Sequence, residues 1–172
     1  MASGSSARRL QLAIRASGDE TRRLYEVLQP GVTAVVAGPH GRFDYRRGGA
    51  RQVWIAAGIG VTPFMSWIRS LDQPFDREVD FFYTVPNEQE APYLEEMQEA
   101  AEQQRALRVH LVLSEREGHL APDDVSKVVQ APLDEVWIYM CGPAPMMRSF
   151  ERRFGQLGVP RSRIFWEHFE LR

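Results

Sequence analysis

Cysteine, histidine and long apolar segments are scarce in this chain. Its 172 residues contain one cysteine, Cys141, which excludes an internal disulfide and leaves too few thiolates for a metal cluster. The four histidines show no ligand spacing, so we predict no metal site. No apolar run approaches the ~20 residues that cross a bilayer. These absences indicate a protein of a reducing compartment without a membrane-spanning helix.

Neither sign of charge dominates the composition. The chain has 21 Lys and Arg against 23 Asp and Glu, and a net charge of -2 argues against nucleic acid as a partner. Hydrophobic residues make up 44% and charged residues 26%, as in an ordinary globular protein. The length suits one sizeable core, or one domain with a fragment of another.

A glycine-rich turn between a strand and a helix is the most informative segment. The apolar strand Gln52–Ala57 leads into Gly-x-Gly-x-x-Pro over Gly58–Pro63. Glycines let the backbone approach a bulky anion, and Pro63 fits the first turn of a helix, whose free N–H groups favour a phosphate. A tight turn that only packs the strand on the helix gives the same pattern, so both interpretations stay open here.

From Gln52 onward, apolar strands alternate with amphipathic helices. The strands expected are Gln52–Ala57, Glu78–Val85, Leu107–Leu113, Glu135–Cys141 and Arg163–Phe169. The helices expected lie near Pro63–Leu71, Ala91–Gln104, Pro122–Val129 and Ala144–Leu157. This order predicts an α/β fold, a five-stranded parallel sheet with helices on both faces.

Residues 1–49 carry a different pattern. Alternating apolar residues predict a half-buried strand over residues 10–15, a short helix after it, and a second strand over Val32–Ala37. Two strands and a short helix cannot bury a core alone. We therefore predict that residues 1–49 are the C-terminal remnant of an antiparallel β domain and that residues 50–172 form the α/β domain.

A second loop stands out where the strand Glu135–Cys141 ends in Cys141-Gly142-Pro143. A lone buried cysteine is more often a small packing residue than a reactive group. Ligands of parallel sheets, however, bind outside the carboxyl ends of the strands. Four candidate loops lie there: Gly58–Pro63, Thr84–Pro86, Ser114–Gly118 and Cys141–Pro145. The thiol would then lie beside whatever the first loop holds.

Together these motifs resemble the C-terminal part of the ferredoxin–NADP reductase superfamily, most closely bacterial ferric-reductase-like and NADPH-oxidase-like flavoproteins. Gly58–Pro63 resembles its pyrophosphate loop, and Cys141–Pro143 resembles the loop beside the nicotinamide. Gly38–Phe43 resembles the segment that closes the flavin barrel, with His40 in place of a tyrosine. Glu167-His168-Phe169 resembles the C-terminal Glu-Asn-Phe whose ring covers the flavin.

The resemblance implies hydride transfer from NAD(P)H to FAD and onward passage of electrons to a haem, ferric iron or similar acceptor. It implies catalytic roles for Cys141, Glu167 and Phe169. The cofactor-binding residues that it implies are Gly18, Thr21, Gly58, Gly60, Val61, Thr62, Pro63, Thr84, Ser114, Arg116, Gly142, Pro143 and Met146.

Some of these positions have an equally good local explanation. Gly18 and Thr21 match an element that meets the flavin pyrophosphate, but they also suit a helix cap. Thr84, Ser114 and Arg116 lie where relatives hold a 2′-phosphate, but Glu115 follows the serine where NADPH enzymes favour arginine. The sequence therefore leaves the choice between NADH and NADPH open.

The Arg-x-Tyr-Ser segment with which the family grips its flavin has no match in this chain. We therefore expect a piece of a longer protein that binds nicotinamide nucleotide, holds FAD poorly and is inactive alone. Its partners would be an upstream flavin barrel and a membrane haem domain, with this part on the cytoplasmic side. Two alternatives remain: the reductase arm of a soluble oxygenase system, and a non-catalytic module that senses or docks nicotinamide nucleotide.

Overall fold

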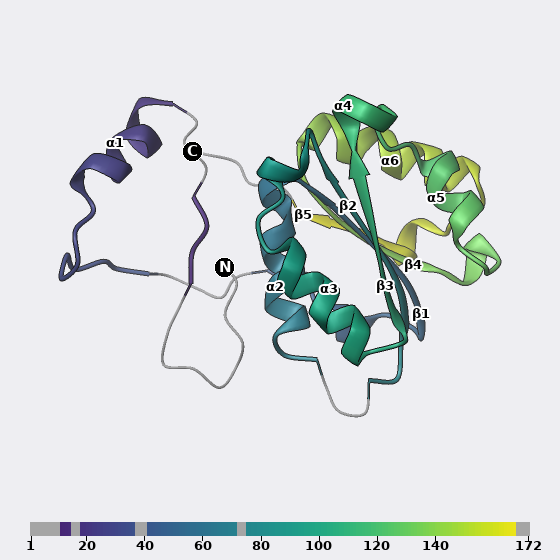
Figure 1. Cartoon of the computed structure of the whole chain (residues 1–172). Coiled ribbons are helices and arrows are strands. Elements are labelled where there is room, and N and C mark those ends of the chain that lie inside the picture. The colour runs from purple at the N-terminus through teal and green to yellow at the C-terminus, as the bar shows by residue number, and fades with distance from the viewer. Residues whose placement is uncertain (1–10, 15–17, 37–40, 72–74, 168–172) are drawn as a thin grey trace.

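The computed structural model describes residues 11–14, 18–36, 41–71 and 75–167. Within them, five strands form one parallel sheet in the order β3-β2-β1-β4-β5 (Figure 1). The strands are β1 (Arg51–Ala57), β2 (Glu78–Val85), β3 (Leu107–Leu113), β4 (Trp137–Cys141) and β5 (Ile164–Glu167). The α/β fold and the five parallel strands predicted from the sequence are confirmed.

Helices cover both faces of the sheet, as Figure 1 shows. One face packs against α2 (Thr62–Ile68) and α3 (Leu94–Gln103), and the other against α5 (Pro122–Val128) and α6 (Ala144–Gln156). A short helix, α4 (Ser114–Glu117), follows β3 directly and was not predicted. No helix in the described ranges is long and apolar enough to cross a membrane.

Five single turns of 3-10 helix connect these elements. They are η1 (Tyr45–Arg47), η2 (Gly58–Val61), η3 (Glu88–Glu90), η4 (Leu133–Glu135) and η5 (Arg161–Arg163). Because Glu135 is the last residue of η4, β4 begins at Trp137 and not at Glu135 as predicted. Helix α3 likewise begins later than the expected Ala91, at Leu94, because Tyr93, in a left-handed conformation (φ 68°), is its N-cap.

The alternation of side chains along each strand explains why the sheet has two cores. In β1, Trp54 and Ala56 belong to the core under α2 and α3, whereas Val53 and Ile55 belong to the core under α5 and α6. In β2, every residue from Val79 to Val85 is buried. Strands of a parallel sheet covered on both faces are buried along their length, and the two polar residues here, Asp80 and Thr84, are buried with the rest.

An aromatic cluster on the α2 face reaches back to the segment before β1. Phe43 stacks on Trp67 with ring centroids 4.8 Å apart, and Tyr45 is 0% exposed against Trp54 and Trp67. The Gln52 amide donates a hydrogen bond to the Tyr45 carbonyl, and its oxygen accepts one from the Trp54 indole, both at 2.9 Å. Burial of these rings anchors the chain from Phe43 onward on the sheet.

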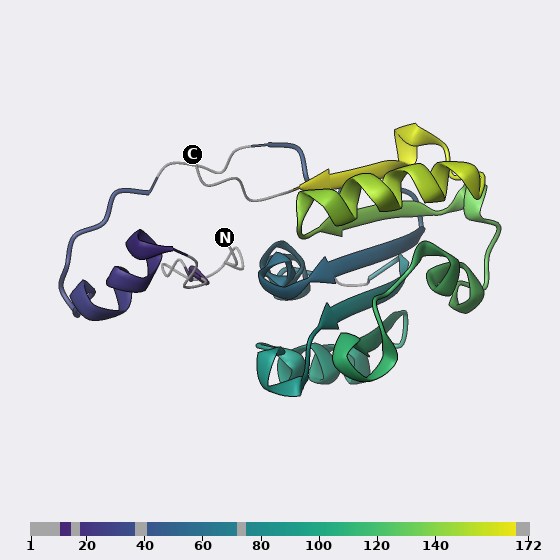
Figure 2. The same cartoon turned by 90° about the horizontal axis from the view of Figure 1, so that it is seen from above.

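The predicted strands of the N-terminal segment are absent. Helix α1 (Asp19–Val27) forms as expected, but residues 11–14 and 32–36 have no regular secondary structure. Figure 2 shows α1 apart from the sheet. Alternating apolar residues specify which face of a strand is buried but supply no hydrogen-bonding neighbour, and isolated strands are at best marginal in water. The prediction for residues 10–15 and Val32–Ala37 was therefore wrong in its described part.

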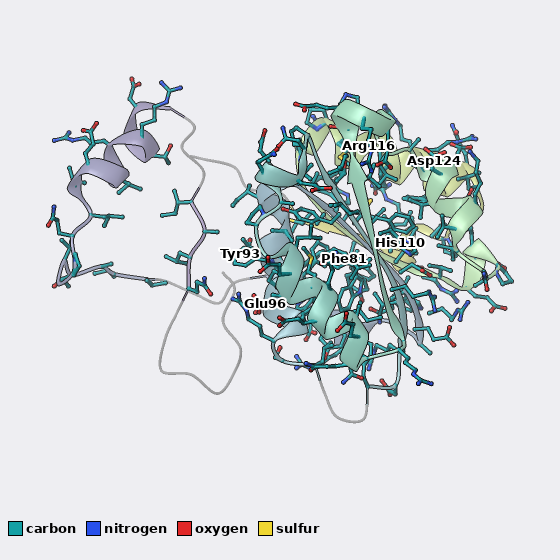
Figure 3. The ribbon with its side chains drawn as sticks, in the orientation of Figure 1. Phe81, Tyr93, Glu96, His110, Arg116 and Asp124 are labelled. Carbon is teal, nitrogen blue, oxygen red and sulfur yellow. The ribbon has the colours of Figure 1, made fainter. Side chains whose placement is uncertain are left out.

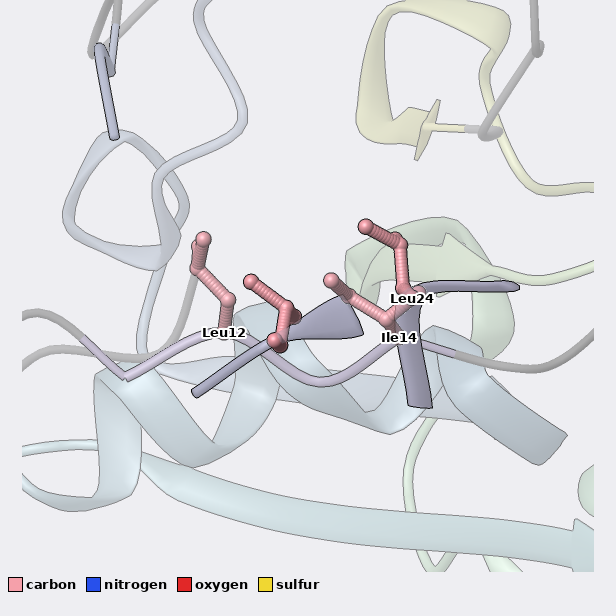
Figure 4. A pocket seen from close by; sticks show the side chains of 4 residues that line it. Leu12, Ile14 and Leu24 are labelled. Atoms are coloured by element: carbon pink, nitrogen blue, oxygen red, sulfur yellow. The ribbon is translucent and has the colours of Figure 1, made fainter. Parts of the chain in front are cut away.

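Apolar side chains of this segment are left half-exposed. Leu12, Ile14, Leu24 and Leu28 line an open apolar hollow of about 290 Å³ (Figure 4). Val35 is 97% exposed. Contact with the sheet domain includes a hydrogen bond of 2.8 Å from the Arg69 guanidinium to the Gln11 side chain. Whether residues 1–49 derive from a flavin barrel stays a prediction.

An ion pair with a buried carboxylate and a partly exposed guanidinium joins β2 to the edge strand β3. Asp80, with a side chain only 5% exposed, accepts two hydrogen bonds of 2.8 Å from Arg108, and His110 Nε2 lies 2.9 Å from its carboxylate. The His110 ring, labelled in Figure 3, stacks on Phe82. Burial alone would raise the pKa of Asp80, but the bonds from Arg108 and His110 outweigh burial and lower it to about 2.

We predict that Asp80→Asn destabilises the fold near neutral pH but not in strong acid. The pKa of Asp80 is lower in the folded chain than its ordinary 3.8, so the carboxylate stabilises the fold above about pH 4. That stabilisation, on the order of 2 kcal/mol, is lost as the pH falls from about 4 to about 2. Urea denaturation of both proteins across this range checks it, with the exposed Asp134→Asn as control. A constant difference between Asp80→Asn and the wild type would contradict it.

Candidate functional site

The order of the strands brings two of the predicted loops side by side. The first strand, β1, lies in the middle of the sheet. β2 and β3 follow on one side of it, and β4 and β5 on the other. The loops after β1 and β4 therefore leave the same edge in opposite directions, which is the topological switch point where such sheets bind ligands. Ala56 pairs with Cys141 in register, so both loops begin at the same level.

Backbone contact holds these two loops together. A Cβ on Gly60 would lie 2.2 Å from the Cys141 carbonyl oxygen, and a Cβ on Gly142 would lie 2.8 Å from the Ala57 Cβ. Neither position has room for a side chain, so both glycines are required by the approach of one loop to the other. This contact is long-range, and the sequence pattern alone did not predict it.

Gly58 is needed for a different reason. Its φ of 53° lies in the left-handed region that favours glycine, and no atom lies within 4 Å of the place where a Cβ would stand. The chain then enters η2, Val61 and Thr62 are buried, and Pro63 lies in the first turn of α2. The turn thus combines a packed side, at Gly60, with an open side, at Gly58.

Cys141 lies at the end of β4 with its thiol sealed in the sheet. It is 0% exposed and pairs in register with Glu167 on β5. Burial, together with the charge of the Glu167 carboxylate, raises the pKa of the thiol to about 12. Cys141 is therefore a neutral thiol at physiological pH and not a nucleophile.

The loops after β2 and β3 are tied to each other at the same edge. The Glu115 amide donates a 3.1 Å hydrogen bond to the Pro86 carbonyl, and the Asn87 side chain donates one of 3.2 Å to the Glu115 carboxylate. Arg116, labelled on α4 in Figure 3, is exposed and pairs with Glu117 at 2.6 Å. Sequence reasoning missed Asn87 and Glu117, although the charge pattern Ser-Glu-Arg-Glu was visible.

The carboxyl edge of the sheet thus gathers most of the predicted site residues. It holds Gly58, Gly60, Val61, Thr62, Pro63, Thr84, Ser114, Arg116, Cys141, Gly142, Pro143, Met146 and Glu167. Gly18 and Thr21 lie apart from it on α1, where the Thr21 hydroxyl donates to the Gly18 carbonyl at 3.4 Å. Phe169 and His168 lie outside the described residues. Within the described ranges, no three His, Cys, Asp or Glu side chains converge to hold a metal ion.

This arrangement, a doubly covered parallel sheet with two interlocked loops at its switch point, defines a nucleotide-binding α/β domain. The family described as oxidoreductase NAD-binding domain matches residues 54–152, more than half of the chain. The chain therefore belongs to this family, as an NAD-binding domain of the ferredoxin–NADP reductase superfamily. The superfamily inferred from the motifs is confirmed.

Curated relatives and solved structures agree with this assignment. The chain is 30% identical over 124 residues to flavohemoprotein B of Dictyostelium discoideum, covering 67% of this chain and 29% of that protein. It is 30% identical over 165 residues to the ferredoxin–NAD(+) reductase component of the alkene monooxygenase system of Xanthobacter autotrophicus, covering 88% and 49%. The chain thus spans half or less of these relatives.

Among solved structures, the CS-b5R domains of human Ncb5or in the NAD+ form share this fold. The TM-score is 0.74 at 25% identity, and the match covers 90% of this chain and 47% of that one. The likeness extends over most of the chain and supports the fold described here.

We predict that Gly60→Ala destabilises the fold by about 1–3 kcal/mol, because its Cβ must push the Cys141 carbonyl away. Gly155→Ala is the matched control: that position lies in α6 with nothing within 4 Å, and alanine suits a helix better than glycine. Thermal melts of both variants check the difference. A Gly60→Ala protein as stable as the Gly155→Ala protein would disprove the close contact of the loops.

We also predict that Cys141 resists alkylation in the folded chain. A pKa of about 12 in place of 9.0 lowers the thiolate fraction about a thousandfold at mildly alkaline pH, and burial blocks access as well. Because the chain has one cysteine, mass spectrometry after iodoacetamide treatment reports on this thiol alone. The same chain in concentrated urea is the control. Equal labelling rates in the two states would refute the sealed position.

Proposed function

We propose that the chain is the nicotinamide-nucleotide-binding part of an NAD(P)H-dependent flavin oxidoreductase. The observation that carries the proposal is the pair of interlocked loops, Gly58–Pro63 and Cys141–Pro143, at the switch point of a domain of the NAD-binding family. The open position at Gly58 fits a bound group, since the space that a Cβ would fill is free. The pyrophosphate would lie over this turn, and the nicotinamide beside Cys141.

The chain's own residues would position the nucleotide and exclude water. Gly58 and Gly60 shape the turn, and the loop at Gly142 and Pro143 would form the wall at the nicotinamide. The uncharged, buried Cys141 thiol would support the nicotinamide position from behind, and Glu167 pairs with it in register on β5. When bound, NAD(P)H supplies a hydride and FAD accepts it. Phe169, two positions after Glu167 in the sequence, would cover the flavin.

FAD would be held mainly by parts of a longer parent. The residues proposed here for flavin contact, Gly18 and Thr21, belong to a segment whose apolar side chains are half-exposed. The relatives support a flavin and haem context through their names, since one is a flavohemoprotein. We propose that electrons pass from FAD to a haem or ferric iron acceptor, in a ferric-reductase-like parent with a membrane haem domain.

A second candidate function follows from another relative. Over 88% of this chain, the match is to a reductase component of an alkene monooxygenase system, so a reductase arm of an oxygenase system is the alternative. A non-catalytic module that binds the nucleotide without turnover is the third. In a purified parent, bleaching of the flavin by NADH or NADPH supports either enzyme, and nucleotide binding without bleaching supports the module.

We predict that NADH shifts the amide resonances of Gly58, Gly60 and Gly142 in the nuclear magnetic resonance spectrum of the 172-residue chain. These amides line the proposed pyrophosphate and nicotinamide positions. Gly155, on the outer surface of α6, is the internal control and should not shift. Saturable shifts at Gly155 with none at the three loop glycines would exclude the proposed site.

A further inference from the structure

The loop proposed to form the nicotinamide wall contacts the hydrophobic core through one methionine of α6. Gly142 is half-buried and Pro143 is exposed, so the loop has an outer side at the carboxyl edge of the sheet. On the inner side, the place where a Cβ of Gly142 would stand lies 2.8 Å from the Ala57 Cβ and 3.4 Å from the Met147 Cε. Met147 is therefore the α6 side chain that approaches Gly142 from the core.

Two observations hold Met147 in this place. Its backbone N–H donates a 3.1 Å hydrogen bond to the Pro143 carbonyl, at the start of α6. Its side chain is 0% exposed and belongs to the core that also contains Ile55 of β1 and Met140 of β4. Because protein interiors are close-packed, the Met147 methyl limits how far Gly142 can move toward the core.

We infer that Met147 is a positioning residue for the nicotinamide, because it supports the Gly142–Pro143 wall from the core without itself reaching the nucleotide. The inference rests on the proposed function. A displacement of about 1 Å at a reacting group can cost about a hundredfold in rate, so the place of this wall matters to hydride transfer. The pyrophosphate turn belongs to the other loop, where Gly58 and Gly60 set its shape. Loss of the Met147 side chain should therefore weaken the contact with nicotinamide selectively.

The test is calorimetric titration of the 172-residue chain with NADH and with ADP-ribose, which has the adenosine and pyrophosphate but no nicotinamide. We expect Met147→Ala to bind NADH about tenfold more weakly than the wild type does, and ADP-ribose within about twofold of it. Met147→Leu keeps most of the side-chain volume, so it should restore most of the NADH affinity.

Met97→Ala is the matched control, because Met97 is also 0% exposed but lies on α3 in the opposite core. This variant should lose stability and keep its affinity for both ligands. Thermal melts show which variants fold, and the smaller truncation Met147→Val replaces Met147→Ala if the latter is unfolded.

Three results would overturn the inference and leave the proposed pyrophosphate site intact. They are an unchanged NADH affinity in the folded Met147 variant, equal losses for NADH and ADP-ribose in it, and equal affinities of the wild type for the two ligands. The same selective loss in Met97→Ala would also overturn it, since any core truncation would then suffice. Failure of the wild type to bind either ligand would overturn the proposed function itself, and the inference with it.

Discussion

The loops at the carboxyl ends of β1 and β4 are in close contact, with the backbone of one against the backbone of the other at Gly60. Gly60 lies against the Cys141–Gly142 peptide, and Gly142 lies against Ala57. The positions of the glycine turn and of Cys141 relative to each other depend on this contact, because it joins the two loops directly. Hydrogen bonds between β1 and β4 fix the register of the two strands. Gly60 and Gly142 let the loops that follow these strands approach each other closely.

The two hydrophobic cores support these loops from opposite faces of the sheet. On the α2 face of the sheet, Trp54, Phe64 and Trp67 belong to the same core as Val61 of the glycine turn. On the opposite face, Met147 and Phe150 of α6 belong to the core that contains residues of β4. Burial of large rings stabilises the domain strongly and leaves the strands little freedom. Charged contacts have a narrower role. The Asp80 pair fastens the edge strand β3, which leads directly into α4.

The sequence predicted most of the sheet, because continuously apolar runs such as Val53–Ala57 favour the inside of a covered sheet. It failed where pairing with a neighbouring strand decides the structure, since residues 32–36 are rich in valine but have no described strand beside them. In the site, motif spacing found the two loops. It could not find the bond from Asn87 to Glu115 or the pairing of Arg116, since both depend on side-chain geometry between loops.

The anchoring of Phe43 and Tyr45 in the aromatic cluster has a mechanical consequence. Since both rings pack on α2 and β1, the chain from Phe43 onward moves as one body with the sheet. Any hinge between this domain and a unit attached ahead of it must lie before Phe43. Tension on that hinge would act on Trp67 and hence on α2, the helix that begins at the glycine turn. A pull from upstream would thereby reach the glycine turn at Gly58–Pro63 through α2.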